Sequence, residues 1–211
     1  MILIKFIYKI PRRVFFVIEI WYTTLMQTNS KAIFAGGCFW CVEHDLRAIP
    51  GVTDVVSGYS GGTLPNPTYA QVCSETTGHR ESVQVLYDPN TVTFKKLCQF
   101  FLDHIDPTDN GGQFHDRGES YKTAIFYHDD EEQKIAESLI KELDESGLFA
   151  PKKVLVDILP AKPFYPAEDY HQQYAQKNPM HYGAYASGSG RVQFVSQTCE
   201  IRDQKKIAWK D

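Results

Sequence analysis

Hydrophobic residues recur along the chain with two different periods. In the segment 81–87 the residues alternate between two faces, so that Glu81 shares one strand face with the hydrophobic residues at 83, 85 and 87. In the segment 94–105 the apolar residues lie three and four positions apart, a spacing that predicts an amphipathic helix. A strand and a helix are therefore predicted here, and Glu81 is a carboxylate on an otherwise apolar strand face.

The same two periods predict further elements on both sides of this pair. The Gly- and Pro-rich segment 58–68 and residues 106–120 are expected to be loops, and the chain after about residue 183 is expected to be irregular. Such long connections favour an α+β fold over a regular doubly wound sheet, namely a two-layer sandwich of a mixed β-sheet with helices packed on it. Strands are predicted over 31–35, 52–57, 121–127 and 154–158, and helices over 38–49, 129–146 and 167–177.

Length and composition limit the class of protein. The chain has 211 residues, which favours one domain, and we place it over 31–211 after an N-terminal extension over 1–30. With 43% hydrophobic and 23% charged residues, the chain can bury a core and is not disordered as a whole. A net charge of -4 argues against nucleic acid as the main partner, since such proteins usually carry a basic surplus.

The first 25 residues resemble a signal peptide in one respect, because basic residues precede the apolar run 14–18. However, Glu19 follows that run, no small-residue cleavage site is present, and the stretch is too short and too polar to cross a bilayer. Met26 lies shortly before the first predicted strand, so a start at Met26 is the simpler interpretation. We expect a cytoplasmic protein without a membrane anchor.

The cysteines point to thiol chemistry. Five cysteines are too few for a disulfide-stapled secreted domain, and two of them form the pair Cys38-x-x-Cys41. Cys38 follows two glycines and opens a predicted helix, where free backbone N–H groups favour a thiolate and lower the pKa of the thiol. Cys98 lies on the apolar face of the helix over 94–105 and is expected to be a core residue. Cys38 is the candidate nucleophile.

Two other interpretations of the cysteine pair remain open. One is a general thiol-disulfide oxidoreductase that uses Cys38 and Cys41, although Phe39-Trp40 is an unusual filling for such a motif. The other is a zinc-stabilised binding module with Cys38, Cys41, Cys73 and His79 as ligands, although these do not form two compact half-sites.

Several ordered blocks resemble the peptide methionine sulfoxide reductase A family, which reduces the S epimer of methionine sulfoxide. The first is the octet GGCFWCVE over 36–43. The resemblance covers about residues 31–182 and implies a ferredoxin-like core. The remaining blocks, in order, are GYSGG at 58–62, PTY at 67–69, TGHRE at 77–81, DPT at 106–108, DRG at 116–118 and FYPAEDYHQQY at 164–174.

The resemblance implies a role for each matching residue in the reduction. Cys38 matches the nucleophile that attacks the sulfoxide sulfur, and Glu81 matches the acid that protonates the departing oxygen. Burial would raise the pKa of such a carboxyl and let it keep a proton at neutral pH. Tyr69 and Tyr121 match the two tyrosines that hydrogen-bond the sulfoxide oxygen.

Three further residues match positions around the substrate, and a fourth is expected to support the site. Phe39 and Trp40 match the aromatic wall that receives the S-methyl group, and Asp116 matches the residue that binds the substrate main chain. His171 lies in a family-like block, where we expect it to make a structural hydrogen bond.

The resolving cysteine is where this chain departs from the commonest family pattern. Many members have Gly at the position of Cys41 and place resolving cysteines in a Gly-rich C-terminal segment, whereas Gly188-Ser189-Gly190 here contains none. Some members do have Cys at that position, so we favour Cys41 over Cys199, which would need a mobile tail. Cys73 is a distant third and is expected to be buried.

The resemblance also implies how the enzyme is recycled. After the oxygen leaves, Cys38 carries a sulfenic acid that a second thiol condenses into a disulfide. No nucleotide loop, metal-ligand pattern or flavin motif is visible, so no cofactor is expected and electrons arrive by thiol exchange from thioredoxin or a dithiol. The expected substrates are oxidised proteins and free methionine sulfoxide, acted on by a monomer.

Overall fold

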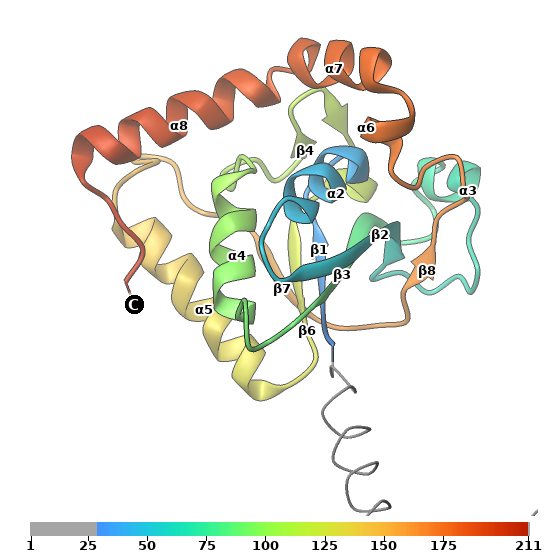
Figure 1. The fold of residues 1–211 in the computed structure, drawn as a ribbon, viewed down its shortest axis with the longest axis horizontal. Helices are drawn as coiled ribbons and strands as arrows, with labels where there is room; N and C mark the ends of the chain where they lie inside the picture. Colours follow the sequence, from blue (N-terminus) through green and yellow to red (C-terminus); the bar gives the residue numbers. More distant parts are fainter. Residues whose placement is uncertain (1–28, 211) are drawn as a thin grey trace, which may run out of the picture.

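The computed structural model of the protein describes residues 29–210. The expectations about a signal peptide and a start at Met26 concern residues outside this range. Six strands form one mixed sheet in the order β7-β6-β1-β3-β2-β8, in which only the β6–β7 pair is parallel (Figure 1). The strands are β1 Ser30–Ala35, β2 Val52–Ser60, β3 Arg80–Tyr87, β6 Ala124–Tyr127, β7 Asp157–Pro160 and β8 Tyr165–Pro166.

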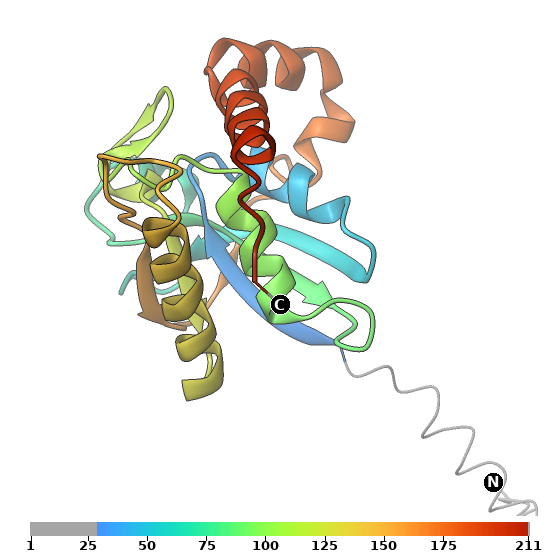
Figure 2. The ribbon, with the colours of Figure 1, turned by 90° about the vertical axis from the view of Figure 1, so that its left-hand side faces the viewer.

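Three helices cover one face of this sheet: α2 Phe39–Arg47, α4 Phe94–Asp103 and α5 Asp130–Glu145. Because side chains alternate along a strand, Phe34 of β1 points to this face, where its ring lies 4.9 Å from that of Phe101. Figure 2 shows α4 and α5 side by side along the sheet. Each fully buried Leu or Phe here contributes about 1.5–3 kcal/mol, which makes this layer the main core.

The opposite face of the sheet has a smaller core. Ile33 and Ala35 of β1 and Phe126 of β6 are buried there against Leu159 and Phe164, which belong to β7 and the connection that follows it. A sheet with helices on one face and a loop on the other is a two-layer α+β arrangement. The predicted fold class is therefore confirmed.

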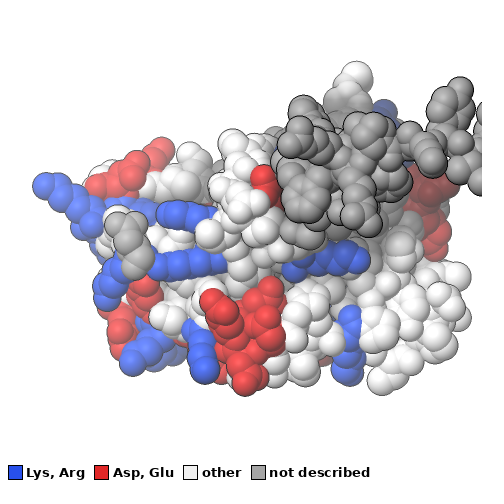
Figure 3. Space-filling model, turned by 60° about the horizontal axis from the view of Figure 1, so that its bottom comes forward, with Lys and Arg blue, Asp and Glu red and all other residues white. Residues whose placement is uncertain are grey.

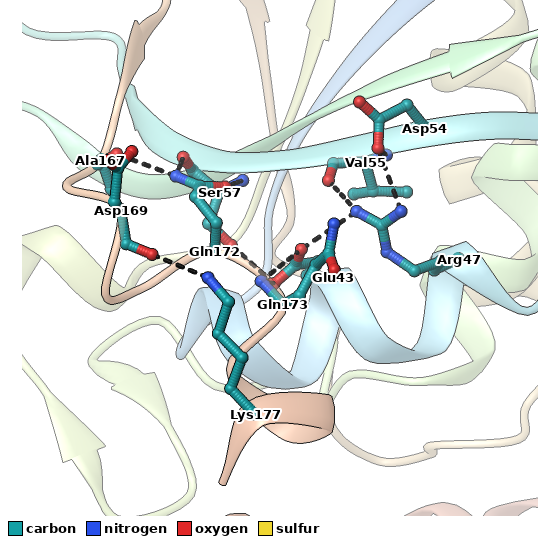
Figure 4. A network of polar contacts seen from close by, with 10 residues as sticks. All are labelled: Glu43, Arg47, Asp54, Val55, Ser57, Ala167, Asp169, Gln172, Gln173 and Lys177. Carbon is teal, nitrogen blue, oxygen red and sulfur yellow. Dashed lines mark hydrogen bonds and ion pairs between the residues drawn. The ribbon is translucent and has the colours of Figure 1, made fainter.

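The segment after β8 is held to α2 and β2 by the polar network in Figure 4. Both carboxylate oxygens of the buried Glu43 accept a hydrogen bond from the backbone N–H of Gln173, and one of them also accepts from Ser57 Oγ at 3.2 Å. Gln172 bonds to the backbone of Ser57 through its amide oxygen and nitrogen. Because a buried carboxylate needs such donors, Glu43 fixes residues 167–173 against α2.

The prediction of an irregular C-terminal segment is wrong. The chain forms α6 Tyr174–Lys177, α7 Pro179–Gly188 and α8 Arg191–Lys205, and the last of these runs back toward α4 (Figures 1 and 2). Helix α8 has no clear apolar stripe in the sequence, and tertiary contacts hold it: Arg202 pairs with Asp103 at 2.7 Å, and Trp209 Nε1 donates to the same carboxylate at 3.0 Å.

Other predicted boundaries are only partly right. The helix expected over 167–177 is confined to α6, the strand expected over 154–158 begins at Asp157, and the strand expected over 121–127 begins at Ala124 after a 3₁₀ turn over Glu119–Tyr121. The hairpin of β4 Gly112–Gln113 with β5 Asp116–Arg117 lies in the segment 106–120 that was predicted to be a loop, and helix α3, Tyr69–Cys73, lies where no element was predicted.

Two observations concern membrane-spanning helices and the charge on one face of the molecule. No helix within residues 29–210 is long and apolar enough to span a bilayer. On the face in Figure 3, the described Lys and Arg side chains are interspersed with Asp and Glu, so this face carries no continuous basic patch.

Candidate active site

A glycine turn places Cys38 at the N-terminus of α2. Gly37 has φ +78°, and a Cβ there would lie 2.5 Å from Cβ of Gln113, so only glycine fits. Cys38 occupies the N-cap position without capping the helix through its side chain. The N–H of Phe39 instead donates to Glu81 Oε2 at 3.0 Å, so a carboxyl from β3 satisfies the helix start next to the thiol.

Glu81 is held in a form that can donate a proton. Its side chain lies on the buried face of β3 and the residue is only 3% exposed. Burial raises its pKa to about 8, against the opposing effect of the Phe39 N–H, and the nearby charge of Asp116 adds to the rise. The carboxyl is therefore largely protonated at neutral pH, as the alternation of this strand predicted.

Tyr69 of α3 and Tyr121 of the 3₁₀ turn bring two phenols to this carboxyl. The two hydroxyls share a hydrogen bond, and Tyr121 also shares one with Glu81. Burial, together with the charge of Glu81, raises the pKa of both tyrosines, so they stay neutral hydrogen-bond donors. The structure thus brings three of the predicted polar residues together.

The two thiols of the site contact each other. Cys38 and Cys41 are both buried and share a hydrogen bond, and all five cysteines are free. Contrary to the expectation from its place at the helix start, the pKa of Cys38 is raised, chiefly by burial and also by its bond to Cys41 and the charge of Glu81. The hydrogen bond from Cys38 lowers the pKa of Cys41, burial opposes this, and the charge of Arg191 adds to the lowering. Of the two thiols, Cys41 is therefore the one whose surroundings favour the thiolate.

Helix α7 contributes two tyrosines that the sequence did not suggest. The Tyr185 hydroxyl donates to Asp116 Oδ2 and also shares a hydrogen bond with the Cys38 thiol. Tyr182, three residues earlier on the same helix, shares one with Cys41. Asp116, one of the predicted substrate-binding residues, is thus brought to the nucleophile through Tyr185, and burial raises its pKa.

An aromatic wall completes the site. The rings of Phe39 and Trp40 lie 4.9 and 5.8 Å from that of His171, whose Nδ1 accepts from Trp40 Nε1 at 3.1 Å. Burial lowers the pKa of His171, so it is neutral and orients the indole, as expected. Tyr174 stacks on the other side of Trp40 with ring centres 3.8 Å apart. These flat surfaces suit a methyl group bound to sulfur.

The remaining cysteines are not part of this cluster of thiols and carboxyl. Cys98 is fully buried in the core, as predicted. Cys73 is exposed, so the expectation that it is buried is wrong. It shares a hydrogen bond with Tyr69 at the edge of the site. Cys199 lies in the middle of α8, exposed, near Asp103 and Arg202 rather than near Cys38.

The predicted zinc ligands do not assemble. Nδ1 of His79 accepts from the N–H of Gly62 at 3.2 Å, and its Nε2 lies 2.8 Å from the carbonyl oxygen of Leu64, so both ring nitrogens are engaged with backbone groups. No group of three or more His, Cys, Asp or Glu side chains within residues 29–210 is placed to hold a metal ion.

Sequence reasoning missed four residues that shape the site: Tyr182, Tyr185, Arg191 and Glu168. Glu168 accepts from the Tyr59 hydroxyl and from the Tyr69 N–H, both at 2.9 Å, and so positions Tyr69. In the sequence, Glu168 was marked only by its place in the family-like block over 164–174. The other three lie in the segment that was expected to be irregular, and no spacing along the chain connects them to Cys38.

Two adjacent thiols beside a protonated carboxyl and neutral phenols define a thiol-dependent reductase. The comparisons with known proteins identify which kind. A family model described as "Peptide methionine sulfoxide reductase" matches residues 30–203. The chain therefore belongs to the peptide methionine sulfoxide reductase family.

Individual relatives agree with this assignment. A Bacillus velezensis protein named peptide methionine sulfoxide reductase MsrA is 55% identical over 173 residues, which cover 82% of this chain and 97% of that protein. A Staphylococcus aureus protein named peptide methionine sulfoxide reductase MsrA 2 is 51% identical over 169 residues, which cover 80% of this chain and 95% of that protein.

Solved structures show the same fold. Methionine sulfoxide reductase A of Corynebacterium diphtheriae superposes with a TM-score of 0.64 at 35% identity, over 72% of this chain and 76% of the other. Mxr1 from Saccharomyces cerevisiae in its reduced form gives 0.65 at 33% identity, over 72% and 86%.

Proposed function

We propose that this protein reduces the S epimer of methionine sulfoxide to methionine, in oxidised proteins and as the free amino acid, with Cys38 as nucleophile. One observation carries the proposal: the Glu81 carboxyl, with its pKa raised to about 8, is bound to the backbone N–H next to Cys38. A sulfoxide placed over that helix start would meet the thiol at its sulfur and the acid at its oxygen.

The first step is the transfer of oxygen from substrate to enzyme. The sulfur of Cys38, as its thiolate, attacks the sulfoxide sulfur while Glu81 protonates the sulfoxide oxygen, which gives an adduct with the Cys38 sulfur and a hydroxyl on the substrate sulfur. The hydroxyl then moves to the Cys38 sulfur as the bonds from the substrate sulfur to oxygen and to Cys38 break. Methionine leaves reduced by two electrons, and Cys38 is oxidised by two electrons to a sulfenic acid. Because burial raises the pKa of the free Cys38 thiol, the proton of this thiol must move to a neighbour as substrate binds, and Cys41 is the hydrogen-bonded acceptor.

The neighbouring side chains match the chemistry of the sulfoxide oxygen, the S-methyl group and the substrate main chain. Tyr69 and Tyr121 are neutral phenols beside Glu81 and can donate to the oxygen as negative charge develops there. Phe39 and Trp40 offer an apolar wall for the S-methyl group. Asp116, held by Tyr185, is the acceptor we assign to the N–H of the substrate main chain.

The second step forms a disulfide that a reductant then opens. We assign the resolving role to Cys41, because its sulfur already shares a hydrogen bond with that of Cys38, whereas Cys199 lies in a folded helix. Some adjustment of the first turn of α2 is needed to close the bond. The reductant is a dithiol, and thioredoxin is the partner that the family resemblance implies; we expect the protein to act as a cytoplasmic monomer without a cofactor.

The deciding experiment is an epimer-resolved assay. Each separated epimer of dabsyl-methionine sulfoxide is incubated with the protein and dithiothreitol, and the product is quantified by chromatography, with Cys38→Ser as the matched control. We expect methionine from the S epimer only, and none from the variant. Reduction of a disulfide substrate with none of either epimer would replace this proposal by a general thiol-disulfide oxidoreductase.

A further inference from the structure

Arg191 is a buried cation at the edge of the thiol pair. It is the first residue of α8, follows a glycine with φ +85°, and is only 6% exposed. Its Nη2 donates to Asp45 Oδ2 at 2.7 Å, and its guanidinium lies 5.8 Å from the centre of the Phe114 ring. Burying a guanidinium costs free energy that an ion pair at best offsets, so stability alone does not account for its position.

The partner of Arg191 places the cation beside Cys41. Asp45 follows Cys41 by four residues on α2, and side chains four apart on a helix are neighbours on one face. The guanidinium bound to Asp45 therefore lies over the same face as the Cys41 sulfur. Tyr182, which shares a hydrogen bond with Cys41, comes from the helix before α8.

Five ionisable groups face Cys41 from the elements packed around it. Cys38 and Asp45 come from α2, Glu81 from β3, Tyr182 from α7 and Arg191 from α8. Asp45 opposes a negative charge on Cys41, and so does Glu81 when it is ionised. Arg191 is the one cation in this group, and its charge lowers the pKa of Cys41.

We propose that Arg191 is a positioning residue for the recycling half of the reaction, holding the resolving sulfur Cys41 as the thiolate that attacks the Cys38 sulfenic acid. The inference rests on the proposed function, in which Cys41 is the resolving cysteine. In the step it serves, the proton that Cys41 took from Cys38 passes to the carboxylate that Glu81 became in the first step. The Cys41 thiolate then forms the sulfur–sulfur bond to Cys38 as the Cys38 sulfur–oxygen bond breaks, and the leaving hydroxide takes this proton from Glu81 and departs as water.

A thiolate is required because it, and not the thiol, is the nucleophile in such an exchange. Arginine suits the role better than lysine, since it stays charged when buried and its planar group can bind Asp45 while facing the sulfur. The geometry therefore separates two tasks: Glu81 supplies protons to departing oxygen, and Arg191 keeps a negative charge on the sulfur that attacks second.

The test is a single-turnover experiment with Arg191→Met, Arg191→Lys and Asp45→Asn beside the wild type. Reduced protein is mixed with one equivalent of S-methionine sulfoxide across a pH series and quenched with acid. Methionine is measured by chromatography, and the Cys38–Cys41 disulfide by alkylation of free thiols and peptide mass spectrometry. Thermal unfolding of each variant checks that it is folded.

Electrostatic and structural roles predict different outcomes. Arg191→Met and Asp45→Asn break the same ion pair. A purely structural role would therefore slow disulfide formation equally in both variants and leave unchanged the midpoint of its pH dependence. We expect instead that Arg191→Met slows disulfide formation about tenfold at neutral pH and moves the midpoint up, as loss of one adjacent charge does. Asp45→Asn should move the midpoint down, and Arg191→Lys should retain most of the rate.

The methionine measurement separates this inference from the proposed function. Release of one equivalent of methionine in every variant, with only the disulfide step altered, supports Arg191. Equal slowing with no shift of the midpoint in either direction overturns its role. A disulfide formed with Cys199 in the wild type, or no methionine at all, would instead refute the proposed function. If Arg191→Met does not fold, the downward shift expected for Asp45→Asn and the rate that Arg191→Lys should retain still decide the matter.

Discussion

At the scale of single residues, the site depends on groups whose chemistry burial changes. Glu81 is an ordinary glutamate by type, and its carboxyl can hold a proton at neutral pH because it is buried on the apolar face of β3, which raises its pKa to about 8. The same burial raises the pKa of Cys38, while the charge of Arg191 and the bond from Cys38 favour a thiolate on Cys41. The surroundings of each sulfur therefore set how readily each thiol loses its proton.

Replacing Glu81 tests its proton directly. Because its pKa is about 8 in the folded protein and 4.5 ordinarily, the folded state binds more protons between these values, and stability falls as pH rises through them. In Glu81→Gln this dependence disappears. We expect the variant to gain on the wild type by up to about 1.4 kcal/mol per pH unit in that window, as measured by urea unfolding. Parallel stability curves for the two proteins would show that Glu81 is ionised when folded.

The same variant should be slow in chemistry. Without an acid for the departing oxygen, Glu81→Gln should release methionine about 10²-fold more slowly than the wild type or worse. A rapid-quench assay of the first turnover measures this rate. A wild-type rate in Glu81→Gln would assign the proton to another group.

Cysteine replacements separate the two halves of the cycle. Cys38→Ser should abolish turnover, whereas Cys41→Ser should release one equivalent of methionine and then stop with thioredoxin as the reductant. Cys199→Ser is the matched control, since its exposed thiol lies away from Cys38, and it should turn over normally. Equal multiple-turnover rates for Cys41→Ser and the wild type would move the resolving role to Cys199.

At the scale of elements, the start of α2 organises the chemistry. The glycine turn lets β1 pass directly into the helix, and the carboxyl of Glu81 replaces an N-cap side chain, so the same hydrogen bond stabilises the helix and places the acid. Helix α7 adds two tyrosines that share hydrogen bonds with the two thiols, and α8 adds the charge of Arg191 near Cys41. The network around Glu43 in Figure 4 holds the connecting segment 167–173 in place.

Substituting Gly37 should disturb this start. In Gly37→Ala the left-handed backbone is strained and the new Cβ lies 2.5 Å from that of Gln113, so we expect a loss of about 1–3 kcal/mol in unfolding free energy and reduced activity. Gly183→Ala is the matched control, because its Cβ meets nothing within 4 Å on helix α7, where alanine is favourable. Comparable losses in both variants would contradict the role of the turn.

At the scale of the whole molecule, the C-terminus fastens the helices that cover the site. Trp209 donates to Asp103 of α4 and lies under the Arg202 guanidinium at 4.7 Å, while Ile207 packs against the main core. Helix α8 therefore has Arg191 at one end, beside the thiols, and this anchor at the other. The two ends of the described chain lie apart in Figure 1.

Removing the contacts of Trp209 should therefore also affect the opposite end of α8, where Arg191 lies. We expect Trp209→Ala to lower amide hydrogen-exchange protection along α8 and to slow disulfide formation more than methionine release. Met180→Ala, at an 89% exposed position of α7, serves as the control and should change neither. Unchanged protection in Trp209→Ala would show that α8 is held by its other contacts.

The sequence alone determined the elements with strong periods and the residues tied to them. The alternation of β3 and the amphipathic pattern of α4 predicted the strand and the helix, and ordered motifs predicted the family; these three predictions are confirmed. They succeed because each depends on neighbours within a few residues, whereas the role of Cys38 as nucleophile stays a prediction. The extent of α8, the exposure of Cys73 and the positions of Tyr185 and Arg191 were decided only by tertiary structure. Each depends on side chains far along the chain: α8 lacks an apolar stripe and is held by α4, and the pKa of each thiol follows from charges that only folding brings near it.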